Sequence, residues 1–249
     1  MYYKTRSHLS QTDYQFIAQS VGHTDSERNA VLRLTDDPEI ISHLLCREDL
    51  FRSIHKDSGT VLSVSSSLYF YCLIYQALNF KHLADADIAD YISGMCVEFT
   101  MNESLWKYST DASERMVYFV DLERVMSDYN EVQQYHMHQH IGNVALYLTG
   151  FFPDIIYQRE KRKGAPSIGY YESKGNSHYE AAANASMQYE SDVTPVLFKL
   201  SEYFSEIRSA INIYVDAYLK LHNSKNVLDR IERQSVTLDE ESFRQTLNI

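Results

Sequence analysis

Clustered histidines carry the most distinctive chemistry in this chain of 249 residues. His136, His138 and His140 alternate with other residues, and His178 follows in a later segment. Imidazoles bind divalent metals and change charge near neutral pH, so such a cluster could hold a metal or move a proton. At about 100° per residue in an α-helix, His136 and His140 share one face and His138 points almost oppositely. In a β-strand all three would face the same way.

A helix is favoured over a strand here, because the apolar residues around the histidines recur at helical spacing. They are Met137, Ile141, Val144, Ala145 and Leu148. His136 and His140 are therefore the predicted metal ligands. A zinc site needs a third protein ligand, which His178, Glu172 or Glu180 could supply from a helix packed antiparallel. The alternative is that these histidines lie half-buried at a helix interface and form hydrogen bonds with tyrosines.

Polar and aromatic side chains near the histidines are the predicted ligand-binding residues. They are Asn143, Tyr147, Tyr170, Tyr171, His178, Tyr179, Arg208 and Asn212. The tyrosines could line a pocket or bond an imidazole, but core packing is the simpler interpretation in a chain with 20 tyrosines. Arg208 and Asn212 lie one turn apart beside an apolar seam and need partners if they are buried. Asp216 is the expected partner of this pair.

Glycines and charges around the histidines indicate how the neighbouring segments are arranged. Gly142 and Gly175 permit a close crossing of two helices. Thr149-Gly150 is expected to end the histidine helix with a left-handed cap, and Pro153 prevents its continuation. The segment 159–165 is expected to be a basic loop that lies in solvent or holds an anion.

The elements that position these residues are helical throughout. Glycine and proline are few, and the apolar residues recur at three and four positions, which predicts an all-α bundle of about eight to ten helices. The segment 68–80 is apolar all round and is expected at the centre. The segment 193–221 repeats apolar residues in alternating steps of four and three, as a bundle helix or a dimer seam does. We expect a bundle domain at 1–223, with 1–57 as a peripheral helical cap, and a polar helix or arm at 224–249.

Composition restricts the partners and the location of the protein. The chain has 34 acidic and 23 basic residues and a formal charge of -11, which repels phosphate backbones and anionic membrane surfaces. We therefore expect neither nucleic acid nor a membrane as a partner. The cysteines at 46, 72 and 96 are widely spaced and odd in number, and the first residues lack the apolar stretch of a secretory signal. These features predict a cytoplasmic protein.

Familiar catalytic motifs are missing from the sequence. It contains no Gly-x-Gly-x-x-Gly, Walker, His-Glu-x-x-His or Gly-x-Ser-x-Gly motif, and no Glu-x-x-His pairs of the kind found in di-iron bundles. This disfavours the common nucleotide-binding, metalloprotease, hydrolase and di-iron classes.

A series of short segments carries a resemblance to known sequences. The segments are Asp49-Leu50-Phe51, Val61 to Ser65 with Leu68-Tyr69-Phe70, Asp90-Tyr91, His140-Ile141-Gly142-Asn143, Leu146 to Pro153, Tyr170-Tyr171-Glu172, Gly175 with Tyr179, and Arg208 with Asn212. Together they resemble a family of uncharacterised bacterial helical proteins. The most specific part is the Gly-Asn, Leu-x-Leu-x-Gly-Phe-Phe-Pro and Tyr-Tyr-Glu-x-x-Gly series. That family has no assigned activity, so the resemblance implies a single cytoplasmic unit and no particular reaction.

Three functions are compatible with these residues. The first is binding of a small ligand, a divalent metal or a protein partner in a groove between the helix of His136 and His140 and the helix of Tyr170 to Tyr179. The second is a metal-dependent or histidine-based enzyme that uses His136, His140 and His178. The third is an interaction scaffold that forms a homodimer along the heptad surface.

Overall fold

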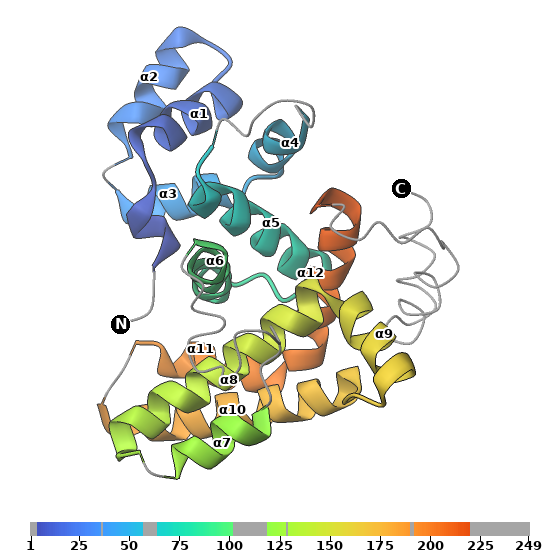
Figure 1. Ribbon diagram of the computed structural model, residues 1–249. Coiled ribbons are helices and arrows are strands. Elements are labelled where there is room, and N and C mark those ends of the chain that lie inside the picture. The colour runs from blue at the N-terminus through green and yellow to red at the C-terminus, as the bar shows by residue number, and fades with distance from the viewer. Residues whose placement is uncertain are drawn as a thin grey trace.

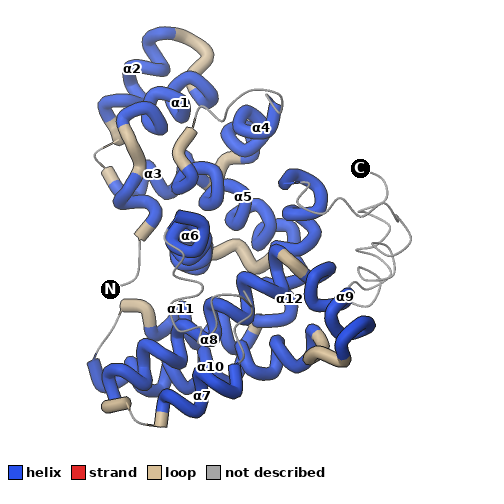
Figure 2. Tube along the Cα trace, viewed as in Figure 1, coloured by secondary structure: helices blue, strands red, loops and turns tan. Residues whose placement is uncertain are grey.

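Within the described residues the chain consists of helices joined by loops and has no strand, which confirms the predicted all-α class (Figure 2). The computed structural model describes residues 4–35, 37–56, 64–101, 119–127, 129–189 and 192–219. Within these ranges the chain forms twelve α-helices and no strand. The count exceeds the predicted eight to ten, partly because the residues 159–163, expected in a loop, are helical and because the helix expected at 193–221 is divided. The predicted arm at 224–249 lies outside the described residues.

The first four helices gather at one end of the molecule, where the third and fourth pack on the fifth, and the first packs on the other three (Figure 1). They are α1 (Gln11–Val21), α2 (Asp25–Arg33), α3 (Pro38–Leu45) and α4 (Glu48–Lys56), after the 3-10 turn η1 (Thr5–His8). Two of them begin at capping residues close in sequence. Thr24 and Glu27 form a capping box at the start of α2, and Asp37 caps α3, which Pro38 begins. Their buried residues, such as Leu45 and Leu50, belong to the same core as the rest of the chain.

Helix α5 (Ser66–Phe80) is the central element, as its apolar sequence predicts. Side chains on all its faces are buried, including Leu68, Tyr71 and Ile74. Helix α6 (Ala86–Met101) packs along it, beginning after Asp85, whose carboxylate accepts hydrogen bonds from the first backbone amides.

Helices α8 (Glu131–Phe151) and α10 (Ile168–Ser186) make the most extensive helix pair in the described structure. The two predicted close-contact glycines lie in this region. A Cβ atom on Gly142 would be 2.7 Å from Cδ1 of Tyr179, and one on Gly175 would overlap the ring of Phe204 and lie 2.9 Å from Cβ of Ala145. The expected close crossing is confirmed. Helix α7 (Phe119–Met126) lies against α8 on the outer side of the α8 and α10 pair (Figure 1).

The end of α8 differs from the prediction. Gly150 is inside the helix, where it packs against Ile211, and does not cap it. Pro153 begins α9 (Pro153–Lys163), which ends at Gly164 in the left-handed conformation, with φ 61°. The basic residues predicted as a loop therefore occupy the last turns of α9, where positive charge stabilises the negative end of the helix dipole.

The predicted long helix at 193–221 is interrupted. It consists of α11 (Thr194–Glu202), α12 (Phe204–Tyr214) and the π-helical turn η4 (Val215–Leu219). Nδ2 of Asn176 donates a hydrogen bond of 2.7 Å to the carbonyl oxygen of Ser201. In a continuous helix this oxygen would accept from the amide of Ser205, so the side chain of α10 displaces a helical bond and explains the break.

Six heptad residues of this segment are buried inside the chain, namely Val193, Leu197, Leu200, Phe204, Ile207 and Ile211. Tyr214 is half-buried, Tyr218 is 39% exposed, and Leu221 lies outside the described residues. Since this stripe fills the core, it does not provide the seam predicted for a homodimer. A homodimer stays a prediction that requires another surface.

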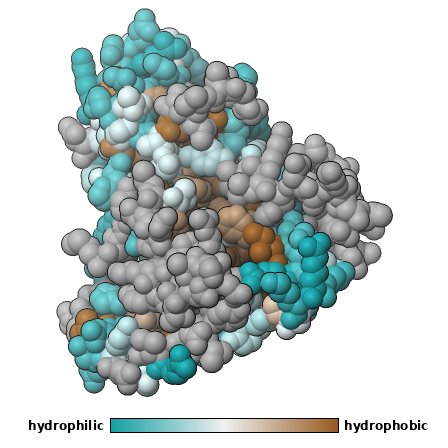
Figure 3. Space-filling model, viewed as in Figure 1, coloured by the Kyte–Doolittle hydropathy of each residue, from teal (hydrophilic) through white to brown (hydrophobic). Residues whose placement is uncertain are grey.

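The surface seen in Figure 3 is polar over the α1 and α2 end and over α9, with apolar residues gathered near the start of α9. Ile155 of α9 is among the exposed large apolar side chains. No helix in the described ranges combines the length and the apolar character needed to span a bilayer.

Candidate functional site

Helices α8 and α10 meet through His138 and His178. Their Nδ1 atoms are 2.8 Å apart, which is a hydrogen-bond distance. Nε2 of His178 lies 3.0 Å from Oε1 of Glu123 on α7, and Nζ of Lys174 donates to the same oxygen at 2.5 Å. Four side chains from three helices thus form one hydrogen-bonded chain. We call Lys174, Glu123, His178 and His138 the histidine relay.

The relay runs from the protein surface into the helix interface. The side chain of His178 is 6% exposed, whereas those of Glu123 and Lys174 are 27% and 31% exposed. Lys174 and His178 are one turn apart on α10, so the helical repeat directs both toward α7. His138 is half-buried on the facing side of α8.

Burial and the neighbouring charges set the protonation of the relay. Burial alone would raise the pKa of Glu123, but hydrogen bonds from Lys174 and His178 outweigh it and lower that pKa. Burial lowers the pKa of His178, although Glu123 partly opposes this effect. Burial, followed by the charge that His178 can carry, also lowers the pKa of His138. At neutral pH the relay therefore contains an ionised carboxylate and two neutral imidazoles.

This charge state determines which nitrogen atoms carry protons. An ionised carboxylate only accepts hydrogen bonds, so Nε2 of His178 is the protonated nitrogen. Nδ1 of the neutral His178 ring is then an acceptor, and Nδ1 of His138 must donate to it. The remaining nitrogen, Nε2 of His138, keeps its lone pair. No residue within the described ranges forms a hydrogen bond with that nitrogen.

The predicted metal ligands are placed elsewhere. His136 is exposed beside the ring of Tyr135, with the ring centroids 4.8 Å apart. His140 faces α6, where its ring meets the ring of Phe99 at a centroid distance of 6.0 Å. Both ring nitrogens of His178 are used by the relay. The prediction that His136, His140 and His178 converge is wrong.

The part of the chain that the structure describes has no set of side chains suited to bind a divalent metal. No group of three His, Cys, Asp or Glu side chains there has an arrangement suited to a metal ion. The histidine that meets α10 is His138, which the sequence placed on the face opposite to His136 and His140 and which was not among the predicted metal ligands. A sequence signal for it exists, because Gly142 lies four residues after His138 and so marks the same face of α8 as the close crossing.

Asn143 belongs to a polar network inside the core. Its Oδ1 atom accepts hydrogen bonds of 2.8 Å from the hydroxyls of Tyr91 and Tyr179. Both tyrosines are buried, and burial raises their pKa values, so the hydroxyls stay protonated and donate. The network joins α6, α8 and α10. It indicates a structural role for Asn143 and Tyr179 in place of the predicted ligand contact.

The other predicted tyrosines do not form one cluster, although the rings of Tyr170 and Tyr171 meet edge to face with their centroids 5.7 Å apart. Tyr147 packs toward α6, with its ring centroid 5.2 Å from that of Phe99. Tyr171 is buried in the core, and Tyr170 is half-buried with Nζ of Lys174 at 5.9 Å from its ring centroid. Of these three tyrosines, Tyr170 is the one placed next to the relay.

Arg208 and Asn212 form a second polar group, on α12. Nε of Arg208 donates to Oε1 of Glu172 at 2.6 Å, and Nδ2 of Asn212 donates to the carbonyl oxygen of Gly150 at 3.2 Å. The expected ion pair is present, but its acid is Glu172 on α10, not Asp216. The break before α12 determines which neighbouring helix Arg208 faces. The apolar periodicity, which predicted one continuous helix, could not indicate this.

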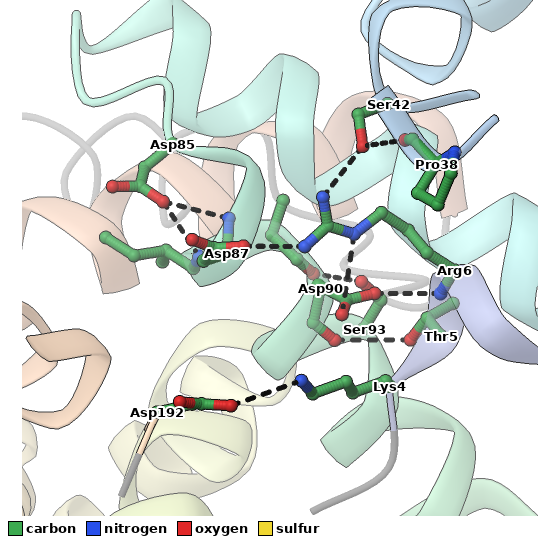
Figure 4. Close-up of polar contacts among 12 residues, drawn as sticks. Lys4, Thr5, Arg6, Pro38, Ser42, Asp85, Asp87, Asp90, Ser93 and Asp192 are labelled. Carbon is green, nitrogen blue, oxygen red and sulfur yellow. Dashed lines mark hydrogen bonds and ion pairs between the residues drawn. The ribbon is translucent and has the colours of Figure 1, made fainter. Parts of the chain in front are cut away.

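A third polar cluster, which the sequence analysis missed, fixes the N-terminal segment (Figure 4). Arg6 lies among Ser42 of α3 and Asp87 and Asp90 of α6, with Nη1 donating to Ser42 at 2.8 Å and Nη2 to Asp87 at 2.6 Å. Its backbone amide donates to Oδ1 of Asp90 at 2.8 Å, and Nε is 3.5 Å from Oδ2. Burial raises the pKa of Asp90, and the contacts with Arg6 oppose that rise. The signal in the sequence is Asp90 itself, an acid within an apolar stretch of α6 that needs a cation.

Comparisons with protein-family models, with curated proteins and with solved structures find no match to this chain. The resemblance to bacterial helical proteins therefore stays a prediction. The function must be argued from the side chains.

Proposed function

We propose that the protein binds a small neutral ligand at the junction of α7, α8 and α10, and that His138 accepts a hydrogen bond from it. The observation that carries this proposal is the histidine relay. It holds the Nε2 atom of His138 as an acceptor, and no described residue uses that atom. The complementary ligand group is a hydroxyl or an N–H.

Charge favours a neutral ligand. Lys174 and Glu123 neutralise each other through a contact of 2.5 Å, and the two imidazoles are neutral at physiological pH. An ion would therefore find no opposite charge in the relay. Tyr170, next to Lys174, adds an aromatic surface on which an apolar part of the ligand can pack.

The same relay favours one alternative, a histidine-based enzyme. A ligand that donates to Nε2 of His138 is placed to transfer its proton, and the charge that forms is stabilised through His178 by Glu123. His138 would then take the role that the sequence predicted for His136 and His140. Turnover that depends on His138, with a rate that falls as the pH falls and His138 becomes protonated, supports this alternative over binding alone.

A cytoplasmic location is part of the proposal. Cys46, Cys72 and Cys96 are free thiols. Cys72 and Cys96 are fully buried, and burial raises their pKa values, which makes them unreactive. Such thiols suit a reducing compartment. The excess of acidic residues supports a small molecule or a protein as partner in place of nucleic acid.

A ligand screen with matched variants tests the binding proposal. Saturation-transfer NMR with neutral alcohols, amides and heteroaromatic fragments is run on the full chain, on His138→Ala and on His136→Ala. We expect binders of the wild type to bind His136→Ala equally and to lose binding to His138→Ala. Circular dichroism and thermal unfolding check that both variants are folded. Binders that bind a folded His138→Ala as well as the wild type would show that the relay is only structural.

A further inference from the structure

The buried face of α12 carries an unusual set of polar side chains. Arg208, Ser209 and Asn212 are 4% to 7% exposed, although α12 otherwise contributes apolar residues to the core. At about 100° per residue they fall within about 100° of the helix circumference. Buried polar groups normally have hydrogen-bond partners, so a face of this kind requires an explanation.

Arg208 uses a small part of its hydrogen-bonding capacity. A guanidinium has five N–H donors, and the bond described for Arg208 joins Nε to Glu172. Its Nη1 and Nη2 atoms have no hydrogen-bond partner among the described residues, and they are not sealed from solvent. Because Glu172 occupies the Nε side of the guanidinium, the edge formed by Nη1 and Nη2 remains available to a ligand. This edge has the geometry that binds a carboxylate with two parallel hydrogen bonds.

Asn212 supplies a second unused group on the same face. Its amide nitrogen is bound to the carbonyl oxygen of Gly150, while its Oδ1 atom has no hydrogen-bond partner in the described part of the chain. Side chains four residues apart on a helix have Cβ atoms about 6 Å apart. A fork that binds a carboxylate thus lies beside an acceptor that binds a hydroxyl.

We infer that Arg208 and Asn212 form a binding site for a small hydroxycarboxylate where α8, α10 and α12 meet. The carboxylate pairs with Nη1 and Nη2 of Arg208, and the neighbouring hydroxyl donates to Oδ1 of Asn212. Glu172 orients the guanidinium and offsets its charge, so a simple carboxylate without the hydroxyl binds weakly. This site uses none of the relay residues, and it is independent of the proposed function.

Thermal unfolding of the full chain with matched anions tests the inference. Sodium lactate and sodium propionate differ by one hydroxyl, and sodium chloride at equal ionic strength controls for salt. We expect lactate to raise the unfolding temperature more than propionate, and chloride to have no comparable effect. The lactate response should disappear in Arg208→Lys, which keeps the charge but loses the fork. It should persist in Arg52→Lys, a control on α4 whose side chain is 74% exposed, and in His138→Ala, which alters the relay alone.

A second variant keeps the inference testable if Arg208→Lys is unfolded. Glu172→Gln preserves an acceptor for Nε and removes the negative charge beside the ligand. We expect it to bind lactate about tenfold more tightly in isothermal titration. The inference is overturned by a wild type that does not respond to lactate, by a folded Arg208→Lys that responds as the wild type does, or by a Glu172→Gln that gains no affinity. Equal responses to lactate and propionate would overturn the role of Asn212.

Discussion

Replacement of Gly175 by alanine should destabilise the protein strongly, because two helices and a ring meet at this position. A Cβ atom there would overlap the ring of Phe204 and lie 2.9 Å from Cβ of Ala145. Phe204 is buried at the start of α12, so its ring cannot swing into solvent. Ala145 belongs to α8, so relief on that side requires a movement of the helix backbone.

The size of the effect follows from two opposed terms. Overpacking of a well-packed core typically costs about 1–3 kcal/mol, and the upper end applies here because the new methyl group is blocked on two sides. Alanine in place of glycine inside a helix gains about 1 kcal/mol. We therefore expect Gly175→Ala to lower the free energy of unfolding by about 2 kcal/mol.

The same helix provides the control. A Cβ atom on Gly169 would meet one neighbour, Oγ of Ser167, at 3.8 Å, which is an ordinary contact. Gly169→Ala should therefore stabilise the protein slightly, by up to about 1 kcal/mol. Urea denaturation of both variants, followed by circular dichroism, gives the comparison. A Gly175→Ala protein as stable as Gly169→Ala would refute the close packing of α8, α10 and α12.

Three further outcomes are expected from the polar networks. Asn143→Ala should lower the free energy of unfolding in urea by about 2 kcal/mol, since the buried hydroxyl of Tyr179 loses its acceptor; an unchanged midpoint would contradict the network. Stability should decrease as the pH falls from about 7 to about 5, because the relay histidines have lowered pKa values and the unfolded chain takes up protons that the folded chain does not. His178→Gln should reduce this dependence of stability on pH, and an unchanged dependence would contradict the lowered pKa of His178. Asp90→Ala should cost about 2 kcal/mol or more in thermal unfolding, because Arg6 loses its buried partner; a loss below about 0.5 kcal/mol would mark the pair as unimportant.

Features with a local cause were predictable from the sequence. The central position of α5 follows from a segment that is apolar on every face, and the capping box of Thr24 with Glu27 is a signal contained within four residues. The close contacts at Gly142 and Gly175 followed from the absence of a side chain. In each case the cause lies within the element itself.

Features that depend on a distant partner were not predictable in the same way. The break between α11 and α12 arises from Asn176, 25 residues earlier in the chain than the carbonyl group that it binds. Glu123 is 55 residues from His178, and its helix follows a segment outside the described residues. Neither pairing leaves a pattern of spacing in the sequence.

The choice of histidine was predictable in part. His136 and His140 share a face, but a shared face does not indicate which neighbouring helix covers it. Gly142 marks the close approach of α10, and it shares its face with His138. Combining these two observations would have selected His138 and His178 as the pair, without identifying the acid that completes the relay.

The protonation of the two relay histidines tests the central claim most directly. Long-range proton–nitrogen NMR correlation spectra at neutral pH distinguish the two neutral forms of each imidazole and the charged form. His138→Gln and His178→Gln assign the signals. We expect the proton of His138 on Nδ1 and the proton of His178 on Nε2, which leaves Nε2 of His138 as the acceptor. A proton on Nε2 of His138, or a charged ring at either position, would contradict the relay and the binding function built on it.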